Sequence, residues 1–136
     1  MKYIVNNSHD PEYNMAFEEY CFRNLPLENE EYVFLWSNSP TILLGKNQNT
    51  YQEINEKYIT ENGIKVVRRI TGGGAIYQDL ENLNFSFVTK TKGNEKIDFK
   101  KYYIPIVNAL KKIGVDAELS GAPKVIVPFP LFIISV

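Results

Sequence analysis

The spacing of hydrophobic and polar residues predicts short strands alternating with helices. Strands are indicated by short runs rich in aromatic and β-branched side chains, and helices by capping residues or by the apolar spacing of an amphipathic helix. The predicted helices cover residues 10–23, with Asn14 as the expected cap, 51–62, ended by Gly63, and 99–113. The predicted strands cover residues 31–36, 41–44, 64–70, 75–77, 83–88 and 115–119. This order predicts one domain with a mixed sheet and flanking helices.

The most informative segment follows the strand predicted at residues 64–70. Alternation along this strand places Arg68 and Arg69 on opposite faces. Three glycines, Gly72 to Gly74, then break the strand, which costs chain entropy and weakens the sheet. Such a turn brings successive backbone N–H groups close to carboxylate or phosphate oxygens, and an arginine nearby supplies a planar cation. We interpret the segment as an anion site. A bulged hairpin whose glycines only relieve crowding is the alternative.

Two other polar segments are weaker candidates. The loop at residues 45–49 offers a glycine, a cation and three amides in a small space, although such loops are usually solvated turns. Asp79, with Asn82 and Asn84 nearby, could orient the glycines or lie near a magnesium ion, and an ordinary polar turn is the alternative. The spacings of the dinucleotide-binding fingerprint and of the P-loop are both missing.

Composition narrows the class of protein. Fifteen basic and sixteen acidic residues give a formal charge of −1, which argues against a dedicated nucleic-acid binder. Cys21 is the only cysteine, so no internal disulfide can form, and a cytoplasmic location is expected. Cys21 is interpreted as a core residue, and His9 as structural or exposed. The apolar residues 127–136 include two prolines and are too few for a spanning helix, so no membrane anchor is expected.

Several motifs in series resemble the lipoate-protein ligase A family, in order from about Tyr3 to Gly121. The segments that carry the resemblance are Asp10–Glu19, Leu35–Trp36, Thr41–Asn49, Arg68–Leu80 and Asn82–Phe85. The resemblance implies an α+β, biotin/lipoate ligase-like catalytic domain with a largely antiparallel mixed sheet. It implies that the carboxylate of lipoate attacks the α-phosphate of ATP, with Mg²⁺ on the phosphates, to give lipoyl-AMP and pyrophosphate. A lysine of a lipoyl acceptor domain, in the glycine cleavage H protein or a 2-oxoacid dehydrogenase E2 subunit, then takes the lipoyl group.

The resemblance also assigns site residues. Those expected to bind ATP or lipoyl-adenylate are Arg68, Gly73, Gly74, Ala75 and Ile76. Those expected to shape the lipoate pocket are Trp36, Gly45, Asn47 and Gly72. No catalytic residue is assigned, because Lys124 follows Gly121 too closely to match the lysine of the family. The metal ligands are left open.

The chain departs from the family pattern in two places. Gln78 stands where many relatives carry histidine; it keeps hydrogen-bonding capacity but is no proton carrier. After Gly121 the pattern is lost, so residues 1–121 are expected to be the N-terminal part of an incomplete catalytic domain and 122–136 a divergent apolar tail. Such a chain alone is expected to form little or no lipoyl-AMP. An octanoyltransferase of the same superfamily and a non-catalytic acyl-binding module are the alternatives.

Overall fold

The computed structural model describes residues 1–90, 98–119 and 125–126. The helices of this part are α1 (Pro11–Asn24), α2 (Thr50–Glu53), α3 (Glu56–Glu61) and α4 (Phe99–Lys112). The strands are β1 (Lys2–Tyr3), β2 (Tyr32–Trp36), β3 (Thr41–Leu44), β4 (Lys65–Arg68), β5 (Ile76–Gln78), β6 (Asn84–Val88), β7 (Glu118–Leu119) and β8 (Val125–Ile126). The mixed α+β fold expected from the sequence is confirmed; β1 and β8 were not predicted.

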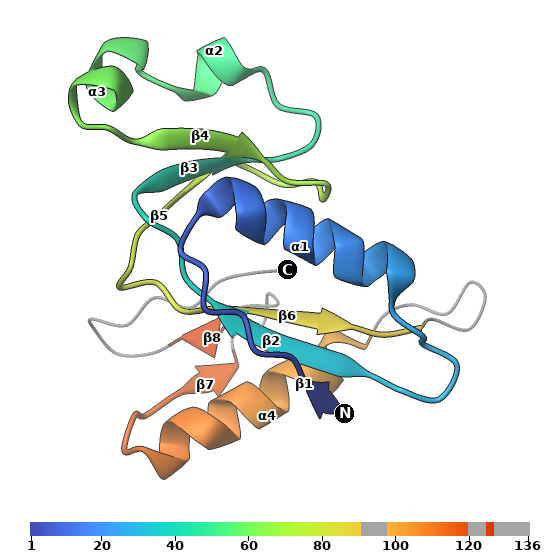
Figure 1. Ribbon diagram of the computed structural model, residues 1–136. Helices are drawn as coiled ribbons and strands as arrows, with labels where there is room; N and C mark the ends of the chain where they lie inside the picture. Colours follow the sequence, from blue (N-terminus) through green and yellow to red (C-terminus); the bar gives the residue numbers. More distant parts are fainter. Residues whose placement is uncertain (91–97, 120–124, 127–136) are drawn as a thin grey trace.

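Two three-stranded sheets form the framework, in the orders β1-β2-β6 and β4-β3-β5 (Figure 1). The pairs β2–β6 and β3–β5 are antiparallel, whereas β1–β2 and β3–β4 are parallel. A short turn connects β2 to β3, and another connects β5 to β6. The two antiparallel pairs are therefore one long ribbon, interrupted at residues 37–40 on one side and 79–83 on the other.

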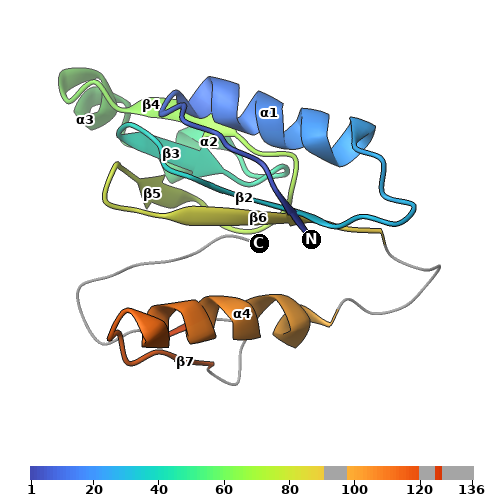
Figure 2. The same cartoon turned by 60° about the horizontal axis from the view of Figure 1, so that its bottom comes forward.

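Helices α1 and α4 lie on opposite sides of the strands (Figure 2). Strand β6 alternates between them, because Ser86 points toward α1 and Phe85 packs with the apolar side chains of α4. The core on the α1 side consists of Met15, Cys21, Tyr32, Phe34, Trp36, Leu43 and Val88. The core on the α4 side consists of Phe85, Tyr103, Val107, Leu110 and Ala117. Both faces of the β2–β6 pair are thus covered.

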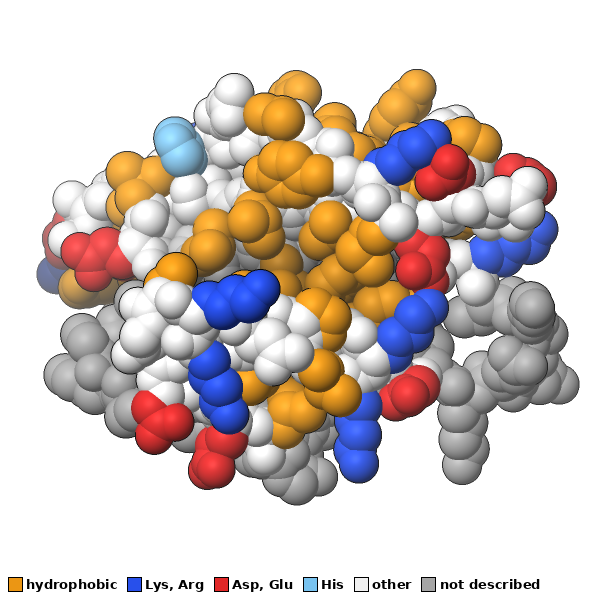
Figure 3. All heavy atoms as spheres, turned by 90° about the horizontal axis from the view of Figure 1, so that it is seen from below, with side chains coloured by type: hydrophobic (Ala, Val, Ile, Leu, Met, Phe, Trp, Pro, Cys, Tyr) orange, Lys and Arg blue, Asp and Glu red, His pale blue; other side chains and the backbone are white. Residues whose placement is uncertain are grey.

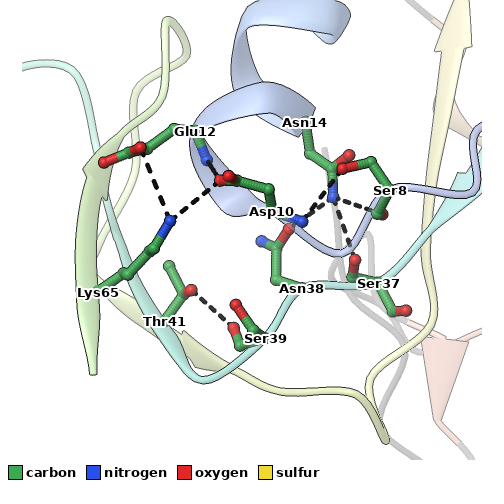
Figure 4. Close-up of polar contacts among 9 residues, drawn as sticks. All are labelled: Ser8, Asp10, Glu12, Asn14, Ser37, Asn38, Ser39, Thr41 and Lys65. Atoms are coloured by element: carbon green, nitrogen blue, oxygen red, sulfur yellow. Dashed lines mark hydrogen bonds and ion pairs between the residues drawn. The ribbon is translucent and has the colours of Figure 1, made fainter. Parts of the chain in front are cut away.

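The N-cap of helix α1 lies four residues before the cap that the sequence suggested. Asp10 is the N-cap, because its side chain accepts from the Glu12 N–H at 2.9 Å, and Pro11 occupies the first turn. The prediction of Asn14 as the cap is wrong. Lys65 Nζ lies 3.2 Å from Asp10 Oδ1 and 3.7 Å from Glu12 Oε2, and these ion pairs link β4 to the start of α1 (Figure 4).

The helix predicted at residues 51–62 is two short helices. Asn49 caps α2 through the Tyr51 N–H, and Asn55 caps α3 through the Tyr58 N–H. A second capping side chain in mid-segment offers the backbone a new helix start in place of a continued first helix. Gly63 follows α3 with a φ of +62°, as a residue just beyond a helix end commonly does.

A chain of buried amides fills the interruption in the ribbon. Asn14 donates to Asn38 at 2.8 Å, Asn38 to Gln78 at 3.0 Å, and Gln78 to Asn84 at 2.7 Å. Asn14 also donates to the carbonyls of Ser8 and Ser37, as Figure 4 shows. These four amide side chains, of Asn14, Asn38, Gln78 and Asn84, are buried, and each both donates and accepts a hydrogen bond. They therefore join α1, the β2–β3 turn, β5 and β6 through one set of hydrogen bonds.

Hydrophobic side chains also reach the surface. Figure 3 shows them gathered across the middle of the face seen from below, between charged groups. Near the N-terminus, the apolar side chains of Met1, Tyr3 and Val5 are exposed. Within the described ranges, no helix combines the length and apolar character needed to cross a bilayer.

Replacing Asn38 tests the amide chain. Asn38→Ala removes two buried hydrogen bonds, the one from Asn14 and the one to Gln78, and a buried polar group that loses its partner costs about 1–3 kcal/mol. We expect the free energy of unfolding, measured by urea denaturation, to fall by that amount or more. Asn24→Ala is the control, because the exposed Asn24 side chain bonds only to the Tyr20 carbonyl among the described residues. Equal losses in the two variants would contradict the role of the buried chain.

Candidate functional site

Two loops meet at the ends of β3 and β4. The glycine loop comprises residues 71–74, and the β3–α2 loop comprises residues 45–49. The Lys46 N–H donates to the Thr71 carbonyl at 2.9 Å. A Cβ atom added at Gly45 would lie 2.0 Å from the carbonyl oxygen of Gly73, so the two backbones are in direct contact. Only glycine fits at position 45 without moving the glycine loop.

Arg68 binds the β3–α2 loop. Its Nη1 donates to the carbonyl oxygens of Gly45 and Gln48, each at 2.8 Å, and its Nη2 donates to Thr50 Oγ1 at 2.7 Å. A planar guanidinium suits such a set of converging acceptors. Arg68 therefore fixes the shape of this loop, and its exposed guanidinium lies beside the loop.

Arg69 binds the glycine loop from the other face of the strand, as the alternation predicted. Its Nη2 donates to the carbonyls of Gly72 at 3.0 Å and Gly74 at 2.8 Å, and its Nη1 donates to the Leu43 carbonyl at 3.2 Å. Gly73 has a φ of +104°, and a Cβ there would lie 2.7 Å from Arg69 Nη2. Both the backbone conformation and the space thus call for glycine at position 73.

The amide groups of the glycine loop point to a ligand. The N–H groups of Gly72, Gly73 and Gly74 donate no hydrogen bond to any residue in the described part of the chain. These three residues are exposed, and added Cβ atoms at Gly72 and Gly74 would meet nothing within 4 Å. Successive N–H groups of this kind form a cradle for the oxygens of a carboxylate or phosphate.

A buried polar cluster lies beneath the site on the α1 side. The Trp36 indole N–H donates to Ser86 Oγ at 3.0 Å, and Ser86 Oγ donates to Glu18 Oε1 at 2.5 Å. Burial raises the pKa of Glu18, and the hydrogen bond from Ser86 and the charge of Arg69 act against that rise. Burial likewise lowers the pKa of Arg69, and the charge of Glu18 opposes that effect.

Sequence reasoning missed Glu18 and Ser86, whereas it included Arg69 with Arg68 in the segment interpreted as an anion site. A signal for Glu18 was present, because Glu18 lies three residues from both Met15 and Cys21 on the helix. Residues three apart share a helix face, and both neighbours are buried. A carboxylate on the inward face of a helix therefore needs a specific partner.

The structure separates the expected pocket residues by depth. Trp36 is buried at 4% exposure and Gly45 is buried, whereas Asn47 and Gly72 are exposed. Ile76 is partly buried against the core on the α1 side. The pocket residues therefore range from the interior of the sheet to the surface of the two loops.

Asp79 belongs to a local turn. Its carboxylate accepts from the Glu81 N–H at 3.0 Å, and its own N–H donates to Asn82 Oδ1 at 2.9 Å. The described residues hold no group of three or more His, Cys, Asp or Glu side chains suited to a metal ion. We assign no Mg²⁺ ligand to them, since Mg²⁺ usually binds through few carboxylates and the phosphates of a nucleotide.

Cys21 and His9 occupy the positions that the sequence indicated. Cys21 is 2% exposed, and burial raises the pKa of its thiol, so it is a core residue without the exposure that a nucleophile needs. His9 is exposed, and its Nδ1 lies 2.9 Å from Ser37 Oγ.

The fold and the two loops together define an α+β protein with an exposed glycine turn beside two arginines. Residues 10–128 match the family model described as the lipoyl protein ligase A/B catalytic domain, and the chain belongs to this family.

Two curated relatives are similar over most of this chain. The lipoate-protein ligase LplJ of Bacillus subtilis is 52% identical over 93% of this chain and 38% of its own length. Lipoate–protein ligase 1 of Staphylococcus aureus is 53% identical over 89% of this chain and 37% of its own length. The chain thus spans well under half of the length of these relatives.

Solved structures of ligases have the same fold. Lipoate-protein ligase A bound with ATP gives a TM-score of 0.81 at 26% identity, over 94% of this chain and 53% of that one. LipL1 of P. falciparum in complex with lipoate gives a TM-score of 0.77 at 33% identity, over 88% of this chain and 38% of that one. A bi-partite lipoate protein ligase with its E2 lipoyl domain, from Thermoplasma acidophilum, gives a TM-score of 0.79 at 26% identity. The match covers 93% of this chain and 51% of that one.

The contact between the two loops can be tested at Gly45. Gly45→Ala places a Cβ against the Gly73 carbonyl, and overpacking of this kind costs about 1–3 kcal/mol of unfolding free energy. Gly72→Ala is the matched control, because its Cβ enters open space at a residue without a positive φ. We expect the control to change the urea midpoint little. A Gly45→Ala variant as stable as Gly72→Ala would contradict the close approach of the loops.

The burial of Glu18 predicts a pH dependence of stability. A carboxyl group whose folded pKa is raised contributes stability that is present below its unfolded pKa, about 4.3, and lost as pH rises through the folded pKa. We therefore expect wild type to lose stability relative to Glu18→Gln as pH rises from 4 toward neutrality. The charged and titratable groups facing Glu18 are Arg69 and the Cys21 thiol, and neither changes charge in the lower part of this range. Urea unfolding at a series of pH values measures the difference. A constant difference would show that Glu18 is not buried as described.

Proposed function

We propose that this chain forms the lipoate- and adenylate-binding part of a lipoate-protein ligase. The protein activates lipoate with ATP and transfers the lipoyl group to a lysine of an acceptor domain. The observation that carries the proposal is the glycine loop, whose carbonyl groups are bound by Arg69 while its N–H groups remain exposed without a described partner. Membership of the ligase family, and the similarity to ligases bound with ATP and with lipoate, support the same ligands.

The chemistry of activation suits such a loop. A carboxylate oxygen of lipoate attacks the α-phosphorus of ATP, and the bond from that phosphorus to the bridging oxygen of pyrophosphate breaks. Negative charge on the phosphoryl oxygens then needs fixed donors in a site with little water. We assign this role to the backbone of Gly73, Gly74, Ala75 and Ile76. The loop also holds the carboxylate and the phosphate at bonding distance, which removes much of the entropic barrier.

Arg68 contributes charge and shape together in this proposal. Its Nη atoms hold the β3–α2 loop, and its exposed cation favours an anionic ligand at the junction of the loops.

The acyl chain of lipoate requires an apolar wall beside the anion site. We assign Trp36, Gly45, Asn47 and Gly72 to this pocket. Trp36 contributes aromatic surface from the core, and Gly45 permits the loops to close over one end. Mg²⁺ would act on the phosphates of ATP, and no step is assigned to it through the described residues.

The acceptor of the lipoyl group is proposed to be a lipoyl domain. The bi-partite ligase of T. acidophilum, whose structure is similar, is described with its E2 lipoyl domain, which supports this class of partner. The acceptors expected are E2 subunits of 2-oxoacid dehydrogenases or the glycine cleavage H protein. We place the ligase-like part at residues 1–121, with 122–136 as a divergent apolar tail, of which the described residues Val125–Ile126 pair with Glu118–Leu119. The single, buried cysteine suits a cytoplasmic location.

Binding at the glycine loop is tested with Gly74→Ala. A Cβ at Gly74 meets nothing within 4 Å, so folding should be unaffected, but the methyl group prevents close approach of a phosphate to the loop. We expect calorimetry with the acyl-sulfamate analogue of lipoyl-AMP to show binding to wild type and at least a tenfold loss in the variant, about 1.4 kcal/mol.

Lys57→Ala is the control for this experiment. Its side chain lies on α3 and is 83% exposed, away from the two loops, so analogue binding should equal that of wild type. No binding of the analogue to wild type, or wild-type affinity in Gly74→Ala, would overturn the assignment of the loop.

A further inference from the structure

We propose that Asn62 is a modification site, where the backbone nitrogen of Gly63 attacks the Asn62 side-chain amide and displaces ammonia. The reaction is intramolecular, takes water as its only other reactant, and is independent of the proposed ligase function. The juxtaposition of an exposed asparagine, a following glycine and the end of a short surface helix carries the inference.

The sequence distinguishes this asparagine from the others. Asn62 is the only asparagine of the chain that is followed by glycine. Any other following residue has a side chain that hinders its amide nitrogen as it approaches a carbonyl carbon, and glycine has none. A Cβ atom added at Gly63 would meet no described atom within 4 Å, so the attacking nitrogen is also free of packing.

The folded conformation holds the two reacting groups apart. Asn62 has a φ of −105° and a ψ of 5°, which turns the Gly63 nitrogen away from the Asn62 side chain. The side chain itself donates from Nδ2 to the Tyr58 carbonyl at 2.8 Å. Ring closure therefore requires the last turn of α3 to open first, and the free energy of that opening sets the rate.

The last turn of α3 is weakly held. The Gly63 N–H donates to the Thr60 carbonyl at 3.4 Å, which is longer than the usual bond of this kind. Helix α3 has six residues, too few for a stable helix by itself, and each of them except the half-buried Ile59 is exposed. Figure 1 shows α3 at the edge of the molecule, beside β4. Opening this turn thus exposes little apolar surface.

The opening stays local because β4 is anchored separately. From Lys65 onward, β4 pairs with β3, and Lys65 Nζ lies 3.2 Å from Asp10 Oδ1. The Ile64 N–H donates to the Ile59 carbonyl at 2.9 Å, and this is the main backbone bond that the rotation breaks. The strand that carries Arg68 is therefore unaffected by the opening.

The reaction balances without a redox partner. The Gly63 nitrogen bonds to Asn62 Cγ, the bond from Cγ to Nδ2 breaks, and the proton of the Gly63 N–H leaves with Nδ2 as ammonia. Water then adds to one carbonyl of the cyclic imide. Opening at the side-chain carbonyl gives aspartate at position 62. Opening at the backbone carbonyl gives isoaspartate, in which the main chain runs through the former side chain.

Both products weaken the end of α3. The amide donor to the Tyr58 carbonyl is lost, and the new carboxylate is ionised at neutral pH. Negative charge is unfavourable at the C-terminal end of a helix, where the helix dipole is itself negative. The modification therefore favours the open form of the turn in which it arises.

The test follows the intact chain in mildly alkaline buffer, with its tryptic peptides measured by mass spectrometry. We expect conversion at Asn62 to be on the order of tenfold faster than at Asn47, which is also exposed but is followed by Gln48. Asn62→Gln is the control variant, because a six-membered ring closes far more slowly, and its peptide of residues 58–65 should stay unmodified. No conversion at Asn62, or equal conversion at Asn47, would overturn the proposal.

A synthetic peptide of residues 58–65 gives the rate without the fold. Because the last turn of α3 opens readily, we expect Asn62 in the intact chain to convert within about tenfold of the rate in the peptide. Chromatography separates the aspartyl from the isoaspartyl product, and we expect both. A larger difference in rate would show that the fold protects Asn62, and would refute the proposed site.

Discussion

The site depends on guanidinium groups binding backbone carbonyls. Two adjacent residues of one strand, Arg68 and Arg69, point to opposite faces, and each takes the carbonyls of a different loop. Glycine at position 45 lets these loops touch, and glycine at position 73 leaves room for the Arg69 guanidinium. Because the carbonyls are occupied in this way, the amide groups of the glycine loop are left for a ligand. In the proposed site, the two cations act on an anionic ligand partly through the peptide units between them.

The polar interior supports this arrangement from below. The β2–β3 turn is held by buried amides from α1, β5 and β6, and the start of β4 is linked to the start of α1 through Lys65. Buried polar groups that are fully paired specify one arrangement of the elements, because any other leaves partners unsatisfied. In the described part of the chain, no buried side-chain nitrogen or oxygen lacks a partner.

Much of this could be predicted from local sequence. Alternation placed the two arginines on opposite faces, and strands β2 to β6 lie within a few residues of their predicted positions. The partnership of Glu18 with Ser86 could not be predicted, because it joins residues far apart in sequence through packing of α1 on β6. Local competition explains two other errors. Asp10 caps α1 where Asn14 was expected, since Asn14 is taken by the buried amides, and Asn55 divides the helix predicted at 51–62.

The identity of residue 78 affects how the interior responds to acidity. Gln78 accepts from Asn38 and donates to Asn84, and a carboxamide keeps both functions at any pH in which proteins fold. An imidazole in that place could do the same only in its neutral form, because an imidazolium has two donors and no acceptor. The buried amide hydrogen bonds between the two halves of the ribbon therefore involve no protonation change, and mildly acidic conditions leave these bonds intact.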